Sequence, residues 1–157
     1  SIVLDSPLGR LGVCLQDGHV NRLNYLPRTW RLRVANTSLE QAVVRQLEAY
    51  FADPRCRFKL PLQMHGTPFQ LRVWQTLQSI PSGKTVTYGQ LAERLDSGAR
   101  AVGNACRRNP IAIIVPCHRV TSAAGIGGYA GKTDGPPLVR KQWLLQHESR
   151  EQGLKTA

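Results

Sequence analysis

Residues 111–120, IAIIVPCHRV, constrain the fold of this chain more than any other segment. Five consecutive apolar residues lead directly into the tetrapeptide PCHR. The apolar run predicts a buried strand, and this strand would deliver a thiol, an imidazole and a guanidinium at its end. Because Pro116 cannot donate a hydrogen bond to a sheet ladder, we expect the strand to break at this proline.

Cys117 is the candidate nucleophile of the segment, and His118 is its candidate base. The thiolate is the reactive form of cysteine, and an unperturbed thiol is only about 3% ionised at pH 7. Adjacent residues of an extended strand point to opposite sides, so the two side chains can cooperate only through a backbone turn or an intervening water. A histidine that acts as a base also needs an orienting partner, usually a carboxylate. Acidic residues are scarce in the C-terminal half, and we expect Glu148 to be this partner; the alternative is an ordinary exposed glutamate at a helix end.

The chain is strongly basic, with 21 Lys and Arg against 10 Asp and Glu, a formal net charge of +11 and a pI near 10.3. Such an excess favours a polyanionic partner, and nucleic acid is favoured over a membrane because no basic amphipathic helix stands out. A basic surface that serves only solubility is the alternative. No apolar run approaches the roughly 20 residues of a membrane span, and the first residues lack the features of a secretion signal. We therefore expect a cytoplasmic protein.

The cysteines form no CxxC pair, and their spacing matches neither a zinc ribbon nor a disulfide scaffold. They are Cys14, Cys56, Cys106 and Cys117. This usage indicates a reducing compartment and mostly buried thiols, three of which would only pack. We predict neither a metal nor an organic cofactor.

The first third of the chain predicts a sheet followed by a helix. The expected strands, joined by tight turns into a meander, are residues 2–5, 10–16 and 19–26. A capping box from Ser38 to Gln41 predicts a helix through about Ala52. Residues 58–64 contain a proline, so we expect them to return as an edge strand.

From Gly66 onward the pattern changes to helices. Capping boxes that begin at Thr67 and Thr87 predict two helices, the second of them over residues 88–95. A turn at 96–98 leads to a further helix over 99–109, which Asn109-Pro110 would end. After the 111–120 segment we expect a glycine-rich loop over 121–137, a helix over 137–148 and a frayed tail.

Two helices joined by a tight turn, as predicted for residues 88–109, are typical of a helix-turn-helix motif. Alanines and a glycine make the second helix slim, while Arg100, Arg107 and Arg108 make it basic. A slim helix flanked by arginines can approach a groove of DNA closely. The alternative is that the small residues allow close packing against another helix, and both explanations can hold on different faces.

Five segments of the second half occur in a fixed order: GTPFQLRVWQTLQSIPSGKTVTYGQLAERL, ARAVGNACRRNP, IVPCHRV, GYAG and WLLQHE. Over roughly residues 66–148 they resemble the O6-alkylguanine-DNA alkyltransferases, and PCHRV with RAVG upstream is the most specific part of the similarity. The fold class is then α/β (α+β). An N-terminal domain of sheet and helix, ribonuclease H-like, would cover residues 1–62, and a winged helix-turn-helix-like domain would cover residues 63–157.

The resemblance implies DNA repair in which an alkyl group, such as methyl, is transferred from O6 of guanine to Cys117 in a single turnover. It implies that His118 deprotonates Cys117 through a water and that Glu148 orients His118. Asn109 would brace the turn of the active site. Tyr88 would hydrogen-bond the guanine and help it leave as a neutral base.

The implied partner is double-stranded DNA with a flipped O6-alkylguanine. The helix over 99–109 would enter the minor groove, and Arg100 would fill the stack that the flipped nucleotide vacates. The implied DNA contacts are Tyr88, Arg100, Ala101, Gly103 and Arg107. Tyr129 and the backbone of Val120 would line the pocket beside Cys117. We expect a monomer, and the sequence leaves cooperation on DNA open.

The chain departs from the family pattern in the length of two stretches, and it lacks the zinc pattern of some members. The stretch between Tyr88 and Arg100 is slightly shorter than in the family. Cys14, His19 and Cys56 do not reproduce the zinc site that some members carry, so we predict none. The stretch between Tyr129 and Trp143, which contains KTDGPP, is several residues longer than in the family.

Three other functions compete with alkyl transfer. A lesion sensor that binds without reacting would lack the acceptor cysteine. A regulator that uses only a helix-turn-helix would not need the Cys-His-Glu set. A cysteine hydrolase would need an oxyanion arrangement that the sequence does not offer, and it would not explain the charge.

Overall fold

The computed structural model describes residues 1–129, 132 and 135–156, with the backbone alone over 150–156. The chain forms two compact units. The first comprises Ser1–Met64 with Pro110–Ala112, and the second comprises His65–Asn109 with Ile113–Ala157. A sheet and a helix in the first unit and mainly helices in the second confirm the predicted α+β class. The predicted division into domains at residue 62 stays a prediction.

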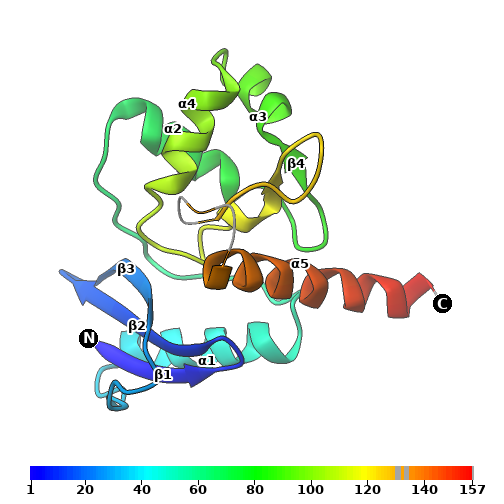
Figure 1. The fold of residues 1–157 in the computed structure, drawn as a ribbon. Helices are drawn as coiled ribbons and strands as arrows, with labels where there is room; N and C mark the ends of the chain where they lie inside the picture. Colours follow the sequence, from blue (N-terminus) through cyan, green and yellow to red (C-terminus); the bar gives the residue numbers. More distant parts are fainter. Residues whose placement is uncertain (130–131, 133–134, 157) are drawn as a thin grey trace. The chain divides into compact units, whose positions relative to one another are not determined.

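The first unit is an antiparallel sheet with one helix packed on it (Figure 1). Its elements, in chain and sheet order, are β1 (Ile2–Ser6), β2 (Gly9–Gln16) and β3 (His19–Leu26), followed by α1 (Ser38–Ala52). The predicted strands are confirmed to within one residue. Asp17 and Gly18 both have positive φ, as a two-residue hairpin between right-twisted strands requires. Val43, Leu47 and Tyr50 form the buried stripe of α1.

The capping box of α1 begins one residue earlier than predicted. Thr37, not Ser38, is the N-cap, and its hydroxyl accepts a hydrogen bond from the Glu40 amide at 3.1 Å. The Glu40 carboxylate accepts in turn from the amides of Asn36 and Thr37, and these hydrogen bonds lower the pKa of Glu40 to about 2. Glu40 can therefore complete a reciprocal box with Thr37, and Gln41 lies one position too late.

The edge strand predicted over 58–64 is wrong, because only one bridge forms there. Val20 donates to the carbonyl of Pro61 at 2.8 Å and accepts from the amide of Gln63 at 2.9 Å. Two residues before Pro61, the side-chain amide of Gln46 on α1 hydrogen-bonds the backbone of Lys59. Its oxygen accepts from the Lys59 amide at 2.7 Å, and its nitrogen donates to the Lys59 carbonyl at 3.1 Å. A side chain thus satisfies the groups that a longer ladder would have paired.

The second unit is built mainly from helices (Figure 1). They are α2 (Pro68–Leu77), α3 (Tyr88–Arg94), α4 (Ala99–Arg107) and α5 (Gly135–Thr156), with the 3₁₀ turn η1 (Cys117–Arg119). Two short parallel strands, β4 (Val86–Thr87) and β5 (Val120–Thr121), pair beside η1. The capping boxes of Thr67 and Thr87 are confirmed, since each hydroxyl accepts from the amide three residues on.

The bounds of α4 and α5 differ from the prediction. α4 ends at Arg107, so Asn109 lies beyond the helix, where its side chain donates a hydrogen bond to the carbonyl of Val115. α5 begins at Gly135 and continues to Thr156, where a tail outside the helix was expected. Residues 133–134, within the KTDGPP segment, lie outside the described residues.

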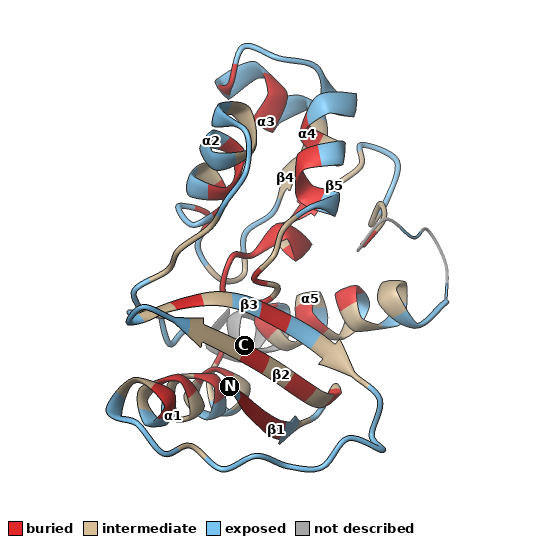
Figure 2. Cartoon of the chain, turned by 90° about the vertical axis from the view of Figure 1, so that its left-hand side faces the viewer, coloured by how far each residue is buried: buried red, intermediate tan, exposed pale blue. Residues whose placement is uncertain are grey.

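The strand predicted over 111–120 is wrong, although the burial is as expected (Figure 2). Ile111 forms a single bridge to Leu23 of β3, and the chain then turns. Ile113 has a φ of +72°, a left-handed conformation that β-branched residues rarely adopt. The side-chain amide of Asn109 donates to the carbonyl of Val115 at 2.8 Å and so replaces a strand partner. The apolar composition of this segment therefore predicted its burial correctly but did not predict its backbone conformation.

The cysteines are less uniformly buried than predicted. Cys106 and Cys117 are buried and Cys14 is half-buried, whereas Cys56 is exposed. Within the part of the chain that the structure describes, no helix is both long and apolar enough to cross a membrane.

We expect Thr37→Ala to lower the free energy of unfolding by about 1 kcal/mol, because the exposed Thr37 side chain contributes chiefly its N-cap hydrogen bond. Ser38→Ala, at the first helical position, should change it by less than about 0.5 kcal/mol. Urea unfolding followed by circular dichroism measures both. A larger loss in Ser38→Ala than in Thr37→Ala would contradict this cap.

Candidate functional site

Cys117 begins the 3₁₀ turn η1 in the second unit and is 8% exposed. Its amide donates to the carbonyl of Val115 at 2.8 Å, and the amide of Arg119 donates to the carbonyl of Pro116 at 3.1 Å. These bonds close two tight turns around the cysteine. Cys117 and His118 therefore do not alternate across a strand, and the geometric objection to their cooperation does not apply.

His118 is fully buried, and its Nε2 lies 2.8 Å from Oε2 of Glu148 on α5. A carboxylate can only accept, so Nε2 carries the proton of the neutral ring and Nδ1 carries the lone pair. Among the described residues, Nδ1 of His118 is one of the few buried side-chain atoms without a hydrogen-bond partner. The histidine thus has one nitrogen fixed and the other able to accept a proton.

Arg119 pairs with the same carboxylate in a bidentate geometry. Its Nε donates to Oε1 of Glu148 at 2.9 Å and its Nη2 donates to Oε2 at 3.0 Å, while Nη1 donates to the carbonyl of Ile80. Burial raises the pKa of Glu148, but the hydrogen bonds and charges of His118 and Arg119 outweigh it and hold that pKa below its ordinary value. Burial lowers the pKa of His118, although Glu148 opposes this shift. At pH 7 the pair is a neutral imidazole beside an ionised carboxylate.

The thiol of Cys117 is subject to opposing effects. Burial raises its pKa, while a hydrogen bond with the Asn109 side chain and the positive charge of Lys141 lower it. The net shift is upward, so the thiol is the resting form and its reaction needs a base. Asn109 also donates to the carbonyl of Val115, and it therefore connects the two sides of the turn that carries the cysteine.

Tyr88 begins α3, and burial raises its pKa to about 12, with further contributions from Cys106 and Cys117. Its phenol is neutral at pH 7 and can donate a hydrogen bond. Tyr129 is 5% exposed and its backbone pairs with Lys132. Both backbone groups of Val120 have partners, since its amide donates to the carbonyl of Cys117 and its carbonyl accepts from Lys141 at 2.7 Å.

Lys141 is a site residue that the sequence reasoning missed. It is fully buried in the second unit, on the face of α5 that also carries Leu144 and Glu148. The spacing 141, 144, 148 follows the helical period and could have indicated that this lysine points inward. Its burial and its charge near Cys117 make it part of the site.

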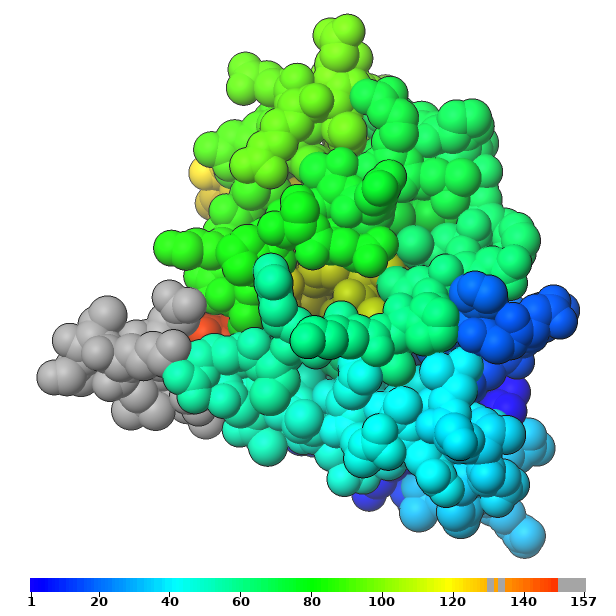
Figure 3. Space-filling view, turned by 180° about the vertical axis from the view of Figure 1, so that it is seen from behind, coloured from blue at the N-terminus to red at the C-terminus, as the bar shows by residue number. Residues whose placement is uncertain are grey.

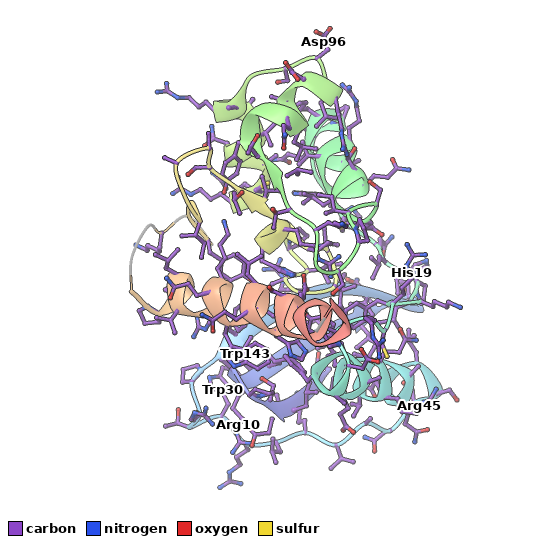
Figure 4. The ribbon with its side chains drawn as sticks, turned by 90° about the vertical axis from the view of Figure 1, so that its right-hand side faces the viewer. Arg10, His19, Trp30, Arg45, Asp96 and Trp143 are labelled. Atoms are coloured by element: carbon purple, nitrogen blue, oxygen red, sulfur yellow. The ribbon has the colours of Figure 1, made fainter. Side chains whose placement is uncertain are left out.

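Four of the five predicted DNA contacts lie on α4, whereas Tyr88 begins α3 and is half-buried. The yellow-green segment just before residue 100 reaches the surface at the top of Figure 3. Arg100, Ala101 and Arg107 are exposed, and the turn before the helix, with Asp96, is at an outer end of this unit (Figure 4). A Cβ placed on Gly103 would meet nothing within 4 Å. Ala105 is instead buried, and its carbonyl accepts from the Trp74 indole at 2.8 Å. Close packing therefore explains Ala105 but does not explain the small residues at 101 and 103.

We expect Glu148→Gln to lower the free energy of unfolding by about 3 kcal/mol at pH 7, because it leaves the Arg119 guanidinium without its carboxylate. The folded-state pKa of Glu148 is lowered, so its contribution is complete above pH 4.5 and is lost as the pH falls below that value. Urea unfolding at pH 7 and pH 3.5 should show the difference between the two proteins shrinking at the lower pH. Glu93→Gln, on the exposed side of α3, is the control and should change stability by less than about 0.5 kcal/mol. A difference independent of pH would contradict the assignment.

Two family models together match most of the chain. The model described as the 6-O-methylguanine DNA methyltransferase, ribonuclease-like domain matches residues 2–64, and the model of the DNA binding domain of the same proteins matches residues 68–150. A methylated-DNA–protein-cysteine methyltransferase of Mycolicibacterium paratuberculosis is 43% identical over 154 residues, which cover 94% of this chain and 90% of that protein. A constitutive protein of the same name from Bacillus subtilis is 39% identical over 139 residues, covering 81% and 84%.

Solved structures agree with these matches. The crystal structure of the Mycobacterium tuberculosis O6-methylguanine methyltransferase superposes with a TM-score of 0.80 at 37% identity, covering 94% of this chain and 91% of that one. The structure of the Mycobacterium tuberculosis protein in complex with DNA gives a TM-score of 0.80 at 41% identity with the same coverage. The resemblance read from residues 66–148 is thus confirmed, and the chain belongs to the 6-O-methylguanine DNA methyltransferase family.

Proposed function

We infer that this protein repairs alkylated DNA directly, by transferring an alkyl group from O6 of guanine to its own Cys117, once per molecule. Membership of the methyltransferase family supports the reaction class. The observation that supports the residue assignment is the buried His118, next to Cys117 in the chain, whose Nε2 is hydrogen-bonded to Glu148 and whose Nδ1 has no hydrogen-bond partner.

In this scheme the Cys117 sulfur displaces guanine from the alkyl carbon. The thiol proton passes through a bridging water to Nδ1 of His118, a carbon–sulfur bond forms, and the bond between that carbon and O6 breaks. Guanine receives the electron pair of the broken bond. The phenol of Tyr88, which is neutral at pH 7, would donate a hydrogen bond that stabilises this charge, and a proton from water then makes the departing guanine neutral.

Asn109 and Glu148 act through other residues. The Asn109 side chain stabilises the Cys117 thiolate by a hydrogen bond and braces the turn at Val115. Glu148 fixes the ring of His118 in the tautomer with the proton on Nε2 and stabilises the imidazolium that forms when Nδ1 is protonated.

Cys106 is the other buried cysteine of this unit, and it is the weaker candidate. Burial, with a smaller contribution from Cys117, raises the pKa of Cys106 to about 12. The Cys106 side chain lies on the packed face of α4. Cys117, in contrast, has a hydrogen bond with the side chain of Asn109, and a histidine follows it in the chain. A base and a stabilising donor favour Cys117 as the acceptor.

On the DNA side, α4 would enter the minor groove of a duplex that carries O6-alkylguanine. The open space around Gly103 permits close approach of the helix backbone to the groove. Arg100 would fill the stack after the nucleotide is extruded, which offsets part of a flipping cost of a few kcal/mol. Tyr129 and Val120 would line the pocket that receives the base. With a net charge of +11, binding should weaken steeply with salt.

The thioether product has no cleaving group beside it in this proposal, so each molecule reacts once and needs no cofactor. A lesion sensor remains the second candidate, but the presence of Cys117 beside a base favours reaction. The monomeric state and the cytoplasmic location stay predictions.

Alkyl transfer is tested by incubating the reduced protein with a duplex that carries O6-methylguanine and measuring its intact mass. We expect a gain of one methyl group in the wild type, in Cys106→Ala and in Cys56→Ala, and none in Cys117→Ala. The absence of a gain in the wild type would overturn the reaction, and a gain in Cys117→Ala would overturn the acceptor.

Arg100→Ala tests the flipping role. We expect it to slow methyl transfer from the duplex by about tenfold or more, equivalent to about 1.4 kcal/mol, while the reaction with free O6-benzylguanine changes less than about twofold. Arg45→Ala removes the same charge from the exposed side of α1 and is the control (Figure 4). Equal losses on both substrates would count against flipping.

A further inference from the structure

Arg72, an exposed residue of α2, has a charged side chain with one fixed nitrogen. Its Nη2 donates to the carbonyl of Leu95, the C-cap residue of α3, at 3.2 Å. This is the one hydrogen bond that the guanidinium makes to a described residue, and none of the ion pairs among those residues includes Arg72. A cap on the end of α3 uses one of its five N–H donors, and an uncharged donor could serve as well. The positive charge is therefore left for another partner.

The hydrogen bond to Leu95 fixes where this charge lies. Leu95 directly precedes the turn of residues 96–98, which joins α3 to α4. This turn is at an outer end of the second unit, as the position of Asp96 shows (Figure 4). The guanidinium thus lies at the end of the unit where α4 begins, and the exposed residues Arg100 and Ala101 belong to the first turn of that helix.

The dimensions of DNA bring this end of the unit to the phosphate backbone. A minor groove is about 6 Å wide, whereas an α-helix with its side chains is about 10–12 Å across. A helix that inserts its first turn into this groove cannot enter completely, so the segments beside that turn meet the backbone at the edge of the groove. In the proposed orientation of α4, such a segment is the turn 96–98, with the Arg72 guanidinium bonded next to it.

Asp96 is the carboxylate that follows Leu95 in the chain, but it does not neutralise Arg72. Asp96 is exposed and takes part in none of the ion pairs among the residues that the structure describes. The turn therefore presents a carboxylate and a guanidinium separately, and the guanidinium is the group that attracts a phosphate.

We propose that Arg72 binds a phosphate of the DNA backbone beside the groove that α4 enters. With Nη2 held by a carbonyl, its other donors can form the charge-assisted hydrogen bonds by which arginine pairs with phosphate. Such a contact fixes the position of the protein along the duplex but does not read its sequence. It lies outside the DNA contacts that the sequence predicted. The proposal rests on the proposed function for the orientation of α4, although the binding is measured without alkyl transfer.

The test measures binding of the whole chain to a fluorescent duplex without an alkylated base, by anisotropy, between about 50 and 200 mM salt. Arg72→Gln keeps a donor for the Leu95 carbonyl but removes the charge. We expect the slope of log K against log salt to become shallower by about 0.9, the value for one phosphate contact. Arg72→Lys keeps the charge and should keep the wild-type slope. Arg45→Gln, at an exposed position of α1, is the control and should also keep it.

Asp96→Asn gives a second measurement at the same turn. Asp96 has a φ of +52°, a left-handed conformation that asparagine also adopts readily, so this change removes a negative charge with little strain. A carboxylate beside the backbone repels it, and we expect the variant to bind the duplex about twofold more tightly or better at about 50 mM salt.

Near-ultraviolet circular dichroism, which reports the packing of the buried Trp74, checks the fold of each variant. A folded Arg72→Gln with the wild-type slope would overturn the proposal, and so would a folded Asp96→Asn that binds no more tightly than the wild type. If Arg72→Gln does not fold, Asp96→Asn decides. Failure of the proposed function is a different result, because it would appear as no methyl gain in the wild type whatever the salt slopes.

Discussion

The bidentate pair between Arg119 and Glu148 is the interaction on which the rest of the site depends. An ionised carboxylate beside a buried imidazole would be unstable without compensation, and burial alone would protonate it. Two hydrogen bonds from the guanidinium keep Glu148 ionised, so it can accept from Nε2 of His118. The tautomer of His118, and with it the position of the accepting nitrogen, therefore follows from a residue that touches neither the sulfur nor a substrate. The same pair also ties η1 to α5, because its two members come from these two elements.

In the proposed function, one short helix of the second unit both packs beside the site and carries the surface for DNA. The buried face of α4 carries Val102, Ala105 and Cys106, and its exposed face carries Arg100 and Arg107. Trp74 fixes the packed side by its hydrogen bond to the Ala105 carbonyl. The two explanations of the small residues in this helix are therefore not exclusive, because they concern opposite faces. Packing explains the small residue on the buried face, and the proposed contact with DNA would explain those on the exposed face.

Features that depend on local interactions could be predicted from the sequence, and features that depend on distant parts of the chain could not. The hairpin at Asp17-Gly18 and the boxes at Thr67 and Thr87 are local, so their residues suffice. The predicted capping box of α1 was one residue too late because Thr37 and Ser38 are both good N-cap residues. The partner three residues later is Glu40 for Thr37 and Gln41 for Ser38, and the box forms with Glu40. Residues 111–120 were misassigned because apolar composition indicates burial but does not determine φ and ψ. Lys141 was missed because lysine is nearly always solvated, and only its helical phase with Leu144 and Glu148 indicated otherwise.

The left-handed backbone of Ile113 has a consequence for how the protein matures. A β-branched residue in that conformation is disfavoured by about 1–3 kcal/mol, so its neighbours in the folded chain must impose it. The turn that presents Cys117 therefore cannot be preformed in a nascent chain, whereas the capped helices can form transiently on their own sequence. During synthesis, or after partial unfolding, Cys117 has neither the ordered turn nor the pair of His118 and Glu148 that the folded chain has. In the proposed function, transfer to Cys117 therefore requires the polypeptide around it to be folded.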